Sequence, residues 1–176
     1  MKIIKIILIA IVSIVALVLI VALFVSKEFH VEKEIVINKP VSAVFNYAKI
    51  LKNQEQYNVW VMADPNMKTN LKGRDGNVGF VYAWDGNDEA GQGEQEITKI
   101  IDNERLETAI RFIRPFEGKA ETYLVTESNG ATQTKVVWGM KGKSVYPMNI
   151  TNLFTDTMLG NDVNKSLTNL KIVLEK

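Results

Sequence analysis

Few side chains in this sequence are of the kinds that catalyse reactions or bind metals. The chain has no cysteine and a single histidine, His30. This excludes thiolate metal sites and leaves little basis for Ser-His-Asp, His-zinc or His general-base chemistry. His30 follows an apolar N-terminal block by a few residues, so we expect it at the surface or near lipid headgroups. We therefore assign no catalytic residue, no metal and no cofactor.

Two groups of carboxylates could act together, but both have simpler explanations. Glu94 and Glu96 are two residues apart, which places them on one face of a strand, as is typical of a solvated face. Asp85, Asp88 and Glu89 crowd a predicted hairpin, where such residues favour turns, and they lack the full spacing of a calcium-binding loop. We interpret both groups as structural.

The arginines Arg111 and Arg114 flank Phe112 on a predicted strand. In that position they could bind an anionic headgroup at the mouth of a cavity, but a surface position is the simpler interpretation.

The N-terminal block has the length and composition of a membrane span. Residues 6–25 contain sixteen Ile, Leu, Val or Phe side chains and no charge. As a helix, about 20 residues rising ~1.5 Å each span roughly 30 Å, the thickness of the hydrocarbon core. A cleaved secretory signal usually has a shorter apolar core and a small-x-small cleavage site, which residues 22–26 lack. We expect residues 1–27 to be a transmembrane signal anchor and residues 28–176 to be one domain.

The orientation of the span does not follow from its flanking charges. Lys2 and Lys5 precede it, and Lys27, Lys33 and Lys39 follow it. A short N-terminal tail followed by a long folded domain is typical of an export signal. We expect a single-pass membrane protein whose domain lies on the extracytoplasmic side.

The charges of the domain are balanced and scattered. After Lys2 and Lys5 are subtracted from the 21 Lys and Arg, residues 27–176 carry 19 of them against 20 Asp and Glu, a net charge of −1. Nucleic-acid binders usually carry a basic stripe or patch. We expect no nucleic-acid partner.

The hydrophobic periodicity predicts an α+β domain. Phe29–Asn38 alternates apolar and charged residues as a strand does, and Pro40 suits the first turn of a following helix. A second short helix or turn is expected over residues 53–61. Apolar residues at helical spacing after Pro147 predict a long C-terminal helix, for which residues 160–162 (Gly-Asn-Asp) are a candidate interruption. Six further strands are predicted over residues 67–72, 78–84, 92–101, 106–114, 120–127 and 132–143.

These elements predict a seven-stranded antiparallel sheet covered by the last helix. This helix is the one that is apolar and long enough to lie across the concave face of the sheet. A curved sheet that closes around a helix tends to leave a gap, and that gap is the natural place for a ligand.

The order of elements and several local patterns resemble the SRPBCC superfamily, which includes START lipid-transfer domains, pollen-allergen-like proteins and polyketide cyclase/dehydrase-like proteins. The resemblance covers residues 29–176. Together the matching patterns look like the membrane-anchored bacterial group of polyketide cyclase/dehydrase-like proteins. The resemblance implies a START-like helix-grip fold with a hydrophobic cavity, and it implies no single chemistry. It rests on residues 35–40 with Val44 and Phe45, Trp60, residues 91–93, 115–118 and 134–140, and Leu167 to Leu174.

Aromatic and thioether side chains are the strongest candidates for the cavity wall. They alternate along three predicted strands, and others would face them from the C-terminal segment. Most could equally be ordinary core residues, and the resemblance is what favours a cavity. The candidates are Tyr57, Trp60, Phe80, Tyr82, Trp84, Ile110, Phe112, Val136, Trp138, Met140, Met148, Phe154 and Met158.

The sequence leaves three functions open. The leading hypothesis is membrane-tethered binding, with carriage as a further option, of a lipid or other hydrophobic small molecule between the sheet and the last helix. A second is a polyketide cyclase/dehydrase-like enzyme acting on an apolar substrate, which would need an ionisable group with a perturbed pKa inside the cavity. A third is a protein-interaction module related to chaperone activators, which would need an exposed apolar patch. The oligomeric state is left open.

Overall fold

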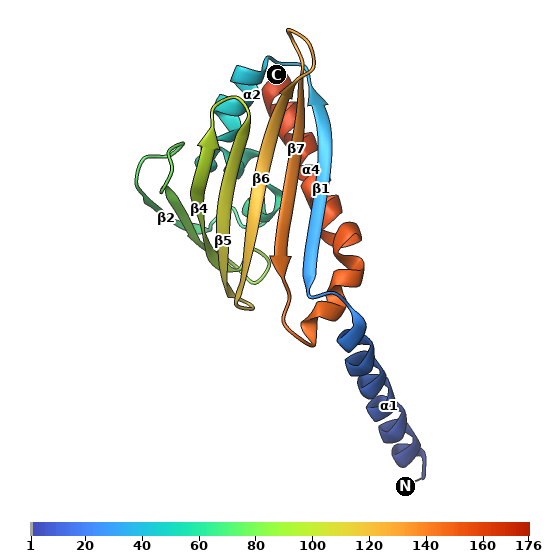
Figure 1. Ribbon diagram of the computed structural model, residues 1–176. Helices are drawn as coiled ribbons and strands as arrows, with labels where there is room; N and C mark the ends of the chain where they lie inside the picture. Colours follow the sequence, from blue (N-terminus) through green and yellow to red (C-terminus); the bar gives the residue numbers. More distant parts are fainter. Residues whose placement is uncertain (1) are drawn as a thin grey trace.

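The computed structural model of the chain describes residues 2–176, and an apolar helix leads into the domain. Helix α1, Lys2–Phe24, extends away from the rest of the chain (Figure 1). Its side chains are exposed, except that Leu19 is partly buried and Ala22 is buried where the helix meets the domain. Among residues 2–176, α1 is the one helix that is long and apolar enough to cross a bilayer.

The domain is built on a seven-stranded antiparallel sheet whose strand order is β1-β7-β6-β5-β4-β3-β2. The last strand therefore lies beside the first, and the other strands form a meander. The strands are β1 (Glu28–Ile37), β2 (Lys68–Lys72), β3 (Val81–Asp85), β4 (Gln92–Ile101), β5 (Arg105–Arg114), β6 (Gly118–Ser128) and β7 (Thr134–Lys143).

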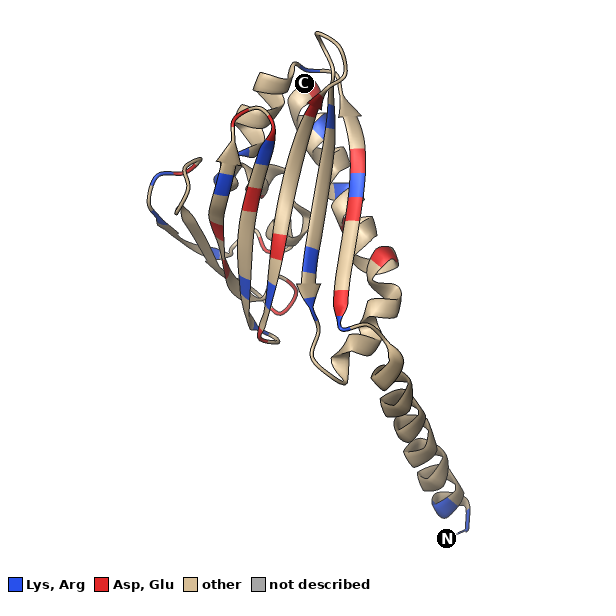
Figure 2. Cartoon of the chain, in the orientation of Figure 1, with Lys and Arg blue, Asp and Glu red and all other residues tan. Residues whose placement is uncertain are grey.

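Alternation along the strands separates the two faces of the sheet. In β1, Val31 and Ile37 are buried on the inner face, while Glu32 and Glu34 point outward. Because side chains alternate with a period of two, the register of each pair places apolar residues together on the inner face. Charged residues recur along the strands (Figure 2), and those that point outward pair across the outer face, as Lys135 does with Glu34 and Lys141 with Glu121.

The C-terminal helix crosses the inner face beside β1. Helix α4, Thr155–Glu175, follows the 3₁₀ helix η2, Met148–Phe154. Ion pairs and hydrogen bonds fasten α4 along the strand. Lys33 Nζ lies 2.8 Å from Asp156 Oδ1, and Lys171 Nζ donates to the Val36 carbonyl at 2.8 Å.

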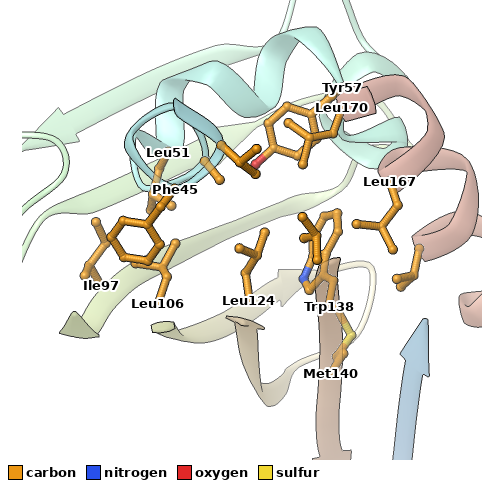
Figure 3. Close-up of a cluster of buried hydrophobic side chains, with 14 of the residues drawn as sticks. Phe45, Leu51, Tyr57, Ile97, Leu106, Leu124, Trp138, Met140, Leu167 and Leu170 are labelled. Atoms are coloured by element: carbon orange, nitrogen blue, oxygen red, sulfur yellow. The ribbon is translucent and has the colours of Figure 1, made fainter. Parts of the chain in front are cut away.

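Three short helices cover the end of the inner face that is far from α1. These are α2 (Val41–Ala48), η1 (Leu51–Gln56) and α3 (Val59–Met62). They pack with α4 over the sheet and close a core, which Figure 3 shows from within. Its fully buried members include Phe45, Leu51, Ile97, Leu167 and Leu170.

The observed architecture confirms the predicted fold class, an α+β sheet of seven antiparallel strands with a long C-terminal helix preceded by an apolar N-terminal helix. One candidate feature is absent: α4 continues through Gly160 without a break. A Cβ on Gly160 would lie 2.7 Å from Lys33 Cε, so glycine makes room there for the lysine that reaches Asp156.

Candidate functional site

Six of the thirteen predicted site residues belong to the solid part of the core. Trp138 lies at its centre, with the rings of Tyr57 and Trp60 meeting it edge-on at 6.2 and 6.4 Å between centroids. These six residues fill space between the sheet and the helices (Figure 3 labels three of them). They are Tyr57, Phe80, Tyr82, Val136, Trp138 and Met140.

Four predicted residues, Trp60, Trp84, Ile110 and Phe112, are only partly buried. The last three lie on the inner face toward α1. Ile110 is in register with Phe29 at the start of β1, through Ala120 and Gly142.

Glycines and aromatic rings shape this end of the inner face. Trp84 lies directly over Gly93, where a Cβ would come within 2.7 Å of the indole ring, and its Nε1 donates to the Ala90 carbonyl. The Phe112 ring meets the Trp84 ring edge-on at 6.3 Å. At Gly118, opposite Phe112, an added Cβ would meet nothing closer than 3.8 Å. The sheet is therefore thinly covered here. We call Trp84, Ile110, Phe112 and Gly118 the open end of the inner face.

The last three predicted residues lie on the surface. Met148 and Phe154 belong to η2, and Met158 to the first turns of α4. Their side chains are exposed by 45%, 59% and 63%. The helical spacing of the segment was correctly recognised, but spacing alone could not show that this turn projects beyond the edge of the sheet.

A short row of polar side chains crosses the inner face next to the open end. Gln95 Nε2 donates to Thr108 Oγ1 at 2.8 Å, and Thr108 Oγ1 lies 2.6 Å from Thr122 Oγ1. All three residues are buried. A few polar groups within an apolar wall are typical of small-molecule sites, where they orient the ligand. These residues were not among the predicted site residues, because each lies on a different strand and no local pattern joins them.

The buried ionisable groups among residues 2–176 are Tyr57 and Tyr82. Burial raises the pKa of both phenols, and the nearby Glu55 carboxylate raises that of Tyr82 further by its charge and by accepting a hydrogen bond. Both side chains are therefore neutral at physiological pH. Such a phenol can donate a hydrogen bond, but it is a poor general base.

The described hollows lie on the outer face of the sheet. The larger is a broad, open depression of about 1450 Å³ over β1, β7, β6, β5 and the start of β4, and a smaller one of about 250 Å³ adjoins it. Ion pairs between neighbouring strands cross this face, such as Lys135–Glu34 at 2.7 Å, Lys141–Glu121 at 2.9 Å and Arg111–Glu94 at 3.1 Å. Since these charges neutralise one another, the depression has the character of a solvated sheet face. The gap between sheet and C-terminal helix stays a prediction.

His30 belongs to this outer face. Its Nε2 lies 2.7 Å from the hydroxyl of Tyr123, which also donates to a carboxylate oxygen of Glu32. The guanidinium of Arg105 lies 4.6 Å from the centre of the Tyr123 ring. The sequence placed His30 at the surface but could not reveal Tyr123, because strands β1 and β6 meet only through β7.

Three of the five acidic groups considered from the sequence, Glu94, Asp85 and Asp88, are paired with arginines. Glu94 pairs with Arg111, and Asp85 accepts from Arg114 at 2.9 Å. Within residues 2–176, no three His, Cys, Asp or Glu side chains are grouped as a metal site requires.

No family model matches the sequence, and no curated protein matches it. Solved structures do match. XoxI from Bacillus cereus is 13% identical with a TM-score of 0.61, over 84% of this chain and 96% of that one. The protein Ara h 8.0201 is 13% identical with a TM-score of 0.56, over 84% and 97%.

The chain has the helix-grip fold. A third match, DynU16 of the dynemicin biosynthetic locus, is 15% identical with a TM-score of 0.58 and covers 84% of this chain but 47% of that one. Likeness at such low identity shows the fold alone. Membership of the SRPBCC superfamily remains a prediction.

Proposed function

We propose that this chain binds a lipid or other hydrophobic small molecule at the open end of the inner face, next to a membrane that α1 spans. The single observation that carries the proposal is the uneven filling of the inner face. One end is packed solid, whereas Trp84, Ile110 and Phe112 remain partly uncovered at the other. Covering these side chains with a ligand would remove apolar surface from water, which stabilises a complex.

The polar row supports a ligand with an apolar body and a small polar group. Gln95, Thr108 and Thr122 lie on the same face as Ile110, so a hydroxyl or carbonyl of the ligand could join their hydrogen bonds. The apolar body would then lie toward Phe112 and Trp84.

Binding is favoured over catalysis by the chemistry of the buried groups. The enzyme hypothesis needs an inward-pointing group that can exchange a proton near neutral pH. Tyr57 and Tyr82 have pKa values raised by burial, which moves them away from that range.

The membrane tether is supported by how the domain holds α1. The last carbonyls of a helix lack partners within the helix. Here Asn149 Nδ2 donates to the carbonyls of Ala22 at 2.7 Å and Val25 at 2.8 Å. A fold that satisfies the end of α1 with its own buried side chain is suited to retaining α1 as an anchor. We place the domain on the extracytoplasmic side.

The test is ligand uptake by the delipidated full-length chain in detergent micelles, followed with a fluorescent fatty acid. Phe112→Ala should weaken binding about tenfold, which corresponds to a contact of ~1.4 kcal/mol. Ile113→Ala is the matched control, because Ile113 is the next residue of β5 and points to the opposite face. No uptake by the parent chain, or equal effects of both variants, would contradict the proposal.

A further inference from the structure

The junction between α1 and the domain is a fixed contact. Besides Asn149, two other side chains of the segment after β7 bind the end of α1. The Tyr146 hydroxyl donates to the Leu19 carbonyl at 3.3 Å, and Asn152 Nδ2 donates to the Ser26 carbonyl at 2.9 Å. Asn149 and Ala22 are buried in this contact. The domain is thereby held at one level along α1.

If α1 spans the bilayer, the domain is held at the bilayer surface. A helix of 23 residues is about 35 Å long, slightly more than the ~30 Å hydrocarbon core, so its C-terminal turns reach the interface. Leu19 lies five residues, or ~7 Å, before the end of α1, so Tyr146, which binds it, lies within about 5 Å of the boundary between hydrocarbon and headgroups. Tyrosine is enriched at that depth because its ring is apolar and its hydroxyl is polar.

The segment around this junction exposes large apolar side chains. Val145 is 72% exposed and Leu153 is 59% exposed, and Met148, Phe154 and Met158 are the surface residues described above. Residues 144–155 contain no Lys, Arg, Asp or Glu, although such residues make up 23% of the chain. In Figure 2 the segment that leads from β7 into α4 is correspondingly drawn in tan. An apolar surface of this kind marks a contact with a membrane or a protein.

We propose that Val145, Tyr146, Met148, Leu153, Phe154 and Met158 form a bilayer-contact surface that seats the domain on the lipid from which α1 emerges. Lipid is the occupant favoured over protein because the surface is continuous with α1. The same side chains that bind α1 belong to the segment that exposes these residues. This inference rests on the proposed membrane span and is independent of ligand uptake.

Seating of this kind gives the proposed ligand a direct route. The open end of the inner face lies toward α1, as the register of Phe29 with Ile110 shows. With the domain seated, an apolar molecule could pass between the bilayer and Phe112 with little exposure to water.

The test uses the absence of native cysteine. Single cysteines carrying an environment-sensitive nitrobenzoxadiazole label are placed in the full chain, reconstituted in phosphatidylcholine–phosphatidylglycerol vesicles. Leu153→Cys probes the surface, and Thr132→Cys in the β6–β7 turn, at the end opposite α1 (Figure 1), is the control. Val15→Cys within α1 reports whether the helix is inserted.

The label at Leu153 should emit at shorter wavelength than that at Thr132, be quenched by lipid-attached nitroxide, and be several-fold less accessible to aqueous iodide. If the Leu153 label is as accessible to iodide as the Thr132 label while the Val15 label is quenched by lipid, the bilayer-contact surface is wrong but the membrane span is supported. A shifted emission without lipid quenching would show that a second copy or another protein covers the surface, which also overturns it. If the Val15 label is itself in water, both the tether and the seating fail.

Discussion

Tyr123 occupies a position on the outer face that depends on the absence of a side chain beneath it. A Cβ on Gly139 would clash with the Tyr123 ring, so the phenol lies over that glycine between His30 and Arg105. Burial raises the pKa of Tyr123 to about 12, and the hydrogen bond to Glu32 and the charge of that carboxylate act in the same direction.

This shift predicts that the protein loses stability in alkali. An unfolded tyrosine has a pKa of ~10. Between that value and about 12, the unfolded chain has lost the phenolic proton while folded Tyr123 keeps it. The unfolded state then binds fewer protons, so the free energy of unfolding falls as pH rises through this range. Tyr123→Phe should cost about 1 kcal/mol or less at neutral pH and should make the alkaline loss less steep.

Denaturant unfolding of the full chain in detergent micelles at a series of pH values measures how steeply the free energy of unfolding falls with pH in the parent and in Tyr123→Phe. The difference between the parent and Tyr123→Phe should be constant below pH 10 and shrink above it. Parallel curves throughout would show that Tyr123 does not hold its proton more tightly in the folded state.

The sequence predicted the surroundings of a single residue where these follow from local sequence. It did not predict contacts between residues that are far apart in the chain. The sequence predicted His30 at the surface or near lipid headgroups, and the histidine is exposed. The contact of His30 with Tyr123 joins residues 93 positions apart, and no local pattern contains it.

At the scale of elements, the contact between η2 and α1 is the one on which the membrane proposals depend. Asn149 is fully buried and supplies two hydrogen bonds to the end of α1, while its Oδ1 is a buried atom without a hydrogen-bond partner. Asn149→Ala leaves two carbonyls without this donor. We expect a loss of about 1–2 kcal/mol, the lower part of the range for such groups because one unsatisfied atom is removed as well.

Thermal unfolding in micelles measures that loss, with Asn161→Ala, an exposed asparagine of α4, as the matched control. A second measurement separates coupling from general stability. Spin labels at Val15→Cys and Lys143→Cys should give a narrow distance distribution in the parent chain and a broader one with Asn149→Ala. Unchanged width would mean that Asn149 does not hold α1.

The elements were the most predictable part of the molecule. Alternation with a period of two placed β4 over residues 92–101, as observed, and the other strands within about three residues of their ends. Less predictable were features that depend on packing. Gly160 was a candidate helix break because glycine disfavours helices, but α4 is continuous there and Gly160 packs against Lys33.

The candidate site was predictable only in part, for the same reason. The sequence indicates which residues share a face, but not how far the covering helices extend. Trp138 and Phe112 therefore looked equivalent, and the structure separates them because α2, η1 and α4 cover one end of the sheet more completely than the other. The polar row of Gln95, Thr108 and Thr122 was hidden because its members lie on three strands.

At the scale of the whole molecule, polarity is arranged in three zones. The outer face is crossed by ion pairs, the inner face is apolar, and the segment 144–155 at the end that meets α1 is uncharged and exposes apolar side chains. Exposed ion pairs contribute little to stability, but they keep the outer face soluble. This distribution suits a domain with one end on lipid and one face in water.

The zones and the buried junction together predict that α1 is retained in the mature protein. Cleavage near residue 25 would remove the carbonyls that Asn149 binds and would expose the apolar segment 144–155 to water. Intact mass spectrometry of the chain isolated from membranes should therefore show residues 6–25 still present, in a fraction that resists alkaline carbonate extraction. A shortened chain in the soluble fraction, with the domain folded and stable, would show that the domain does not need α1. In that case the tether would be wrong even if the open end of the inner face still took up a ligand.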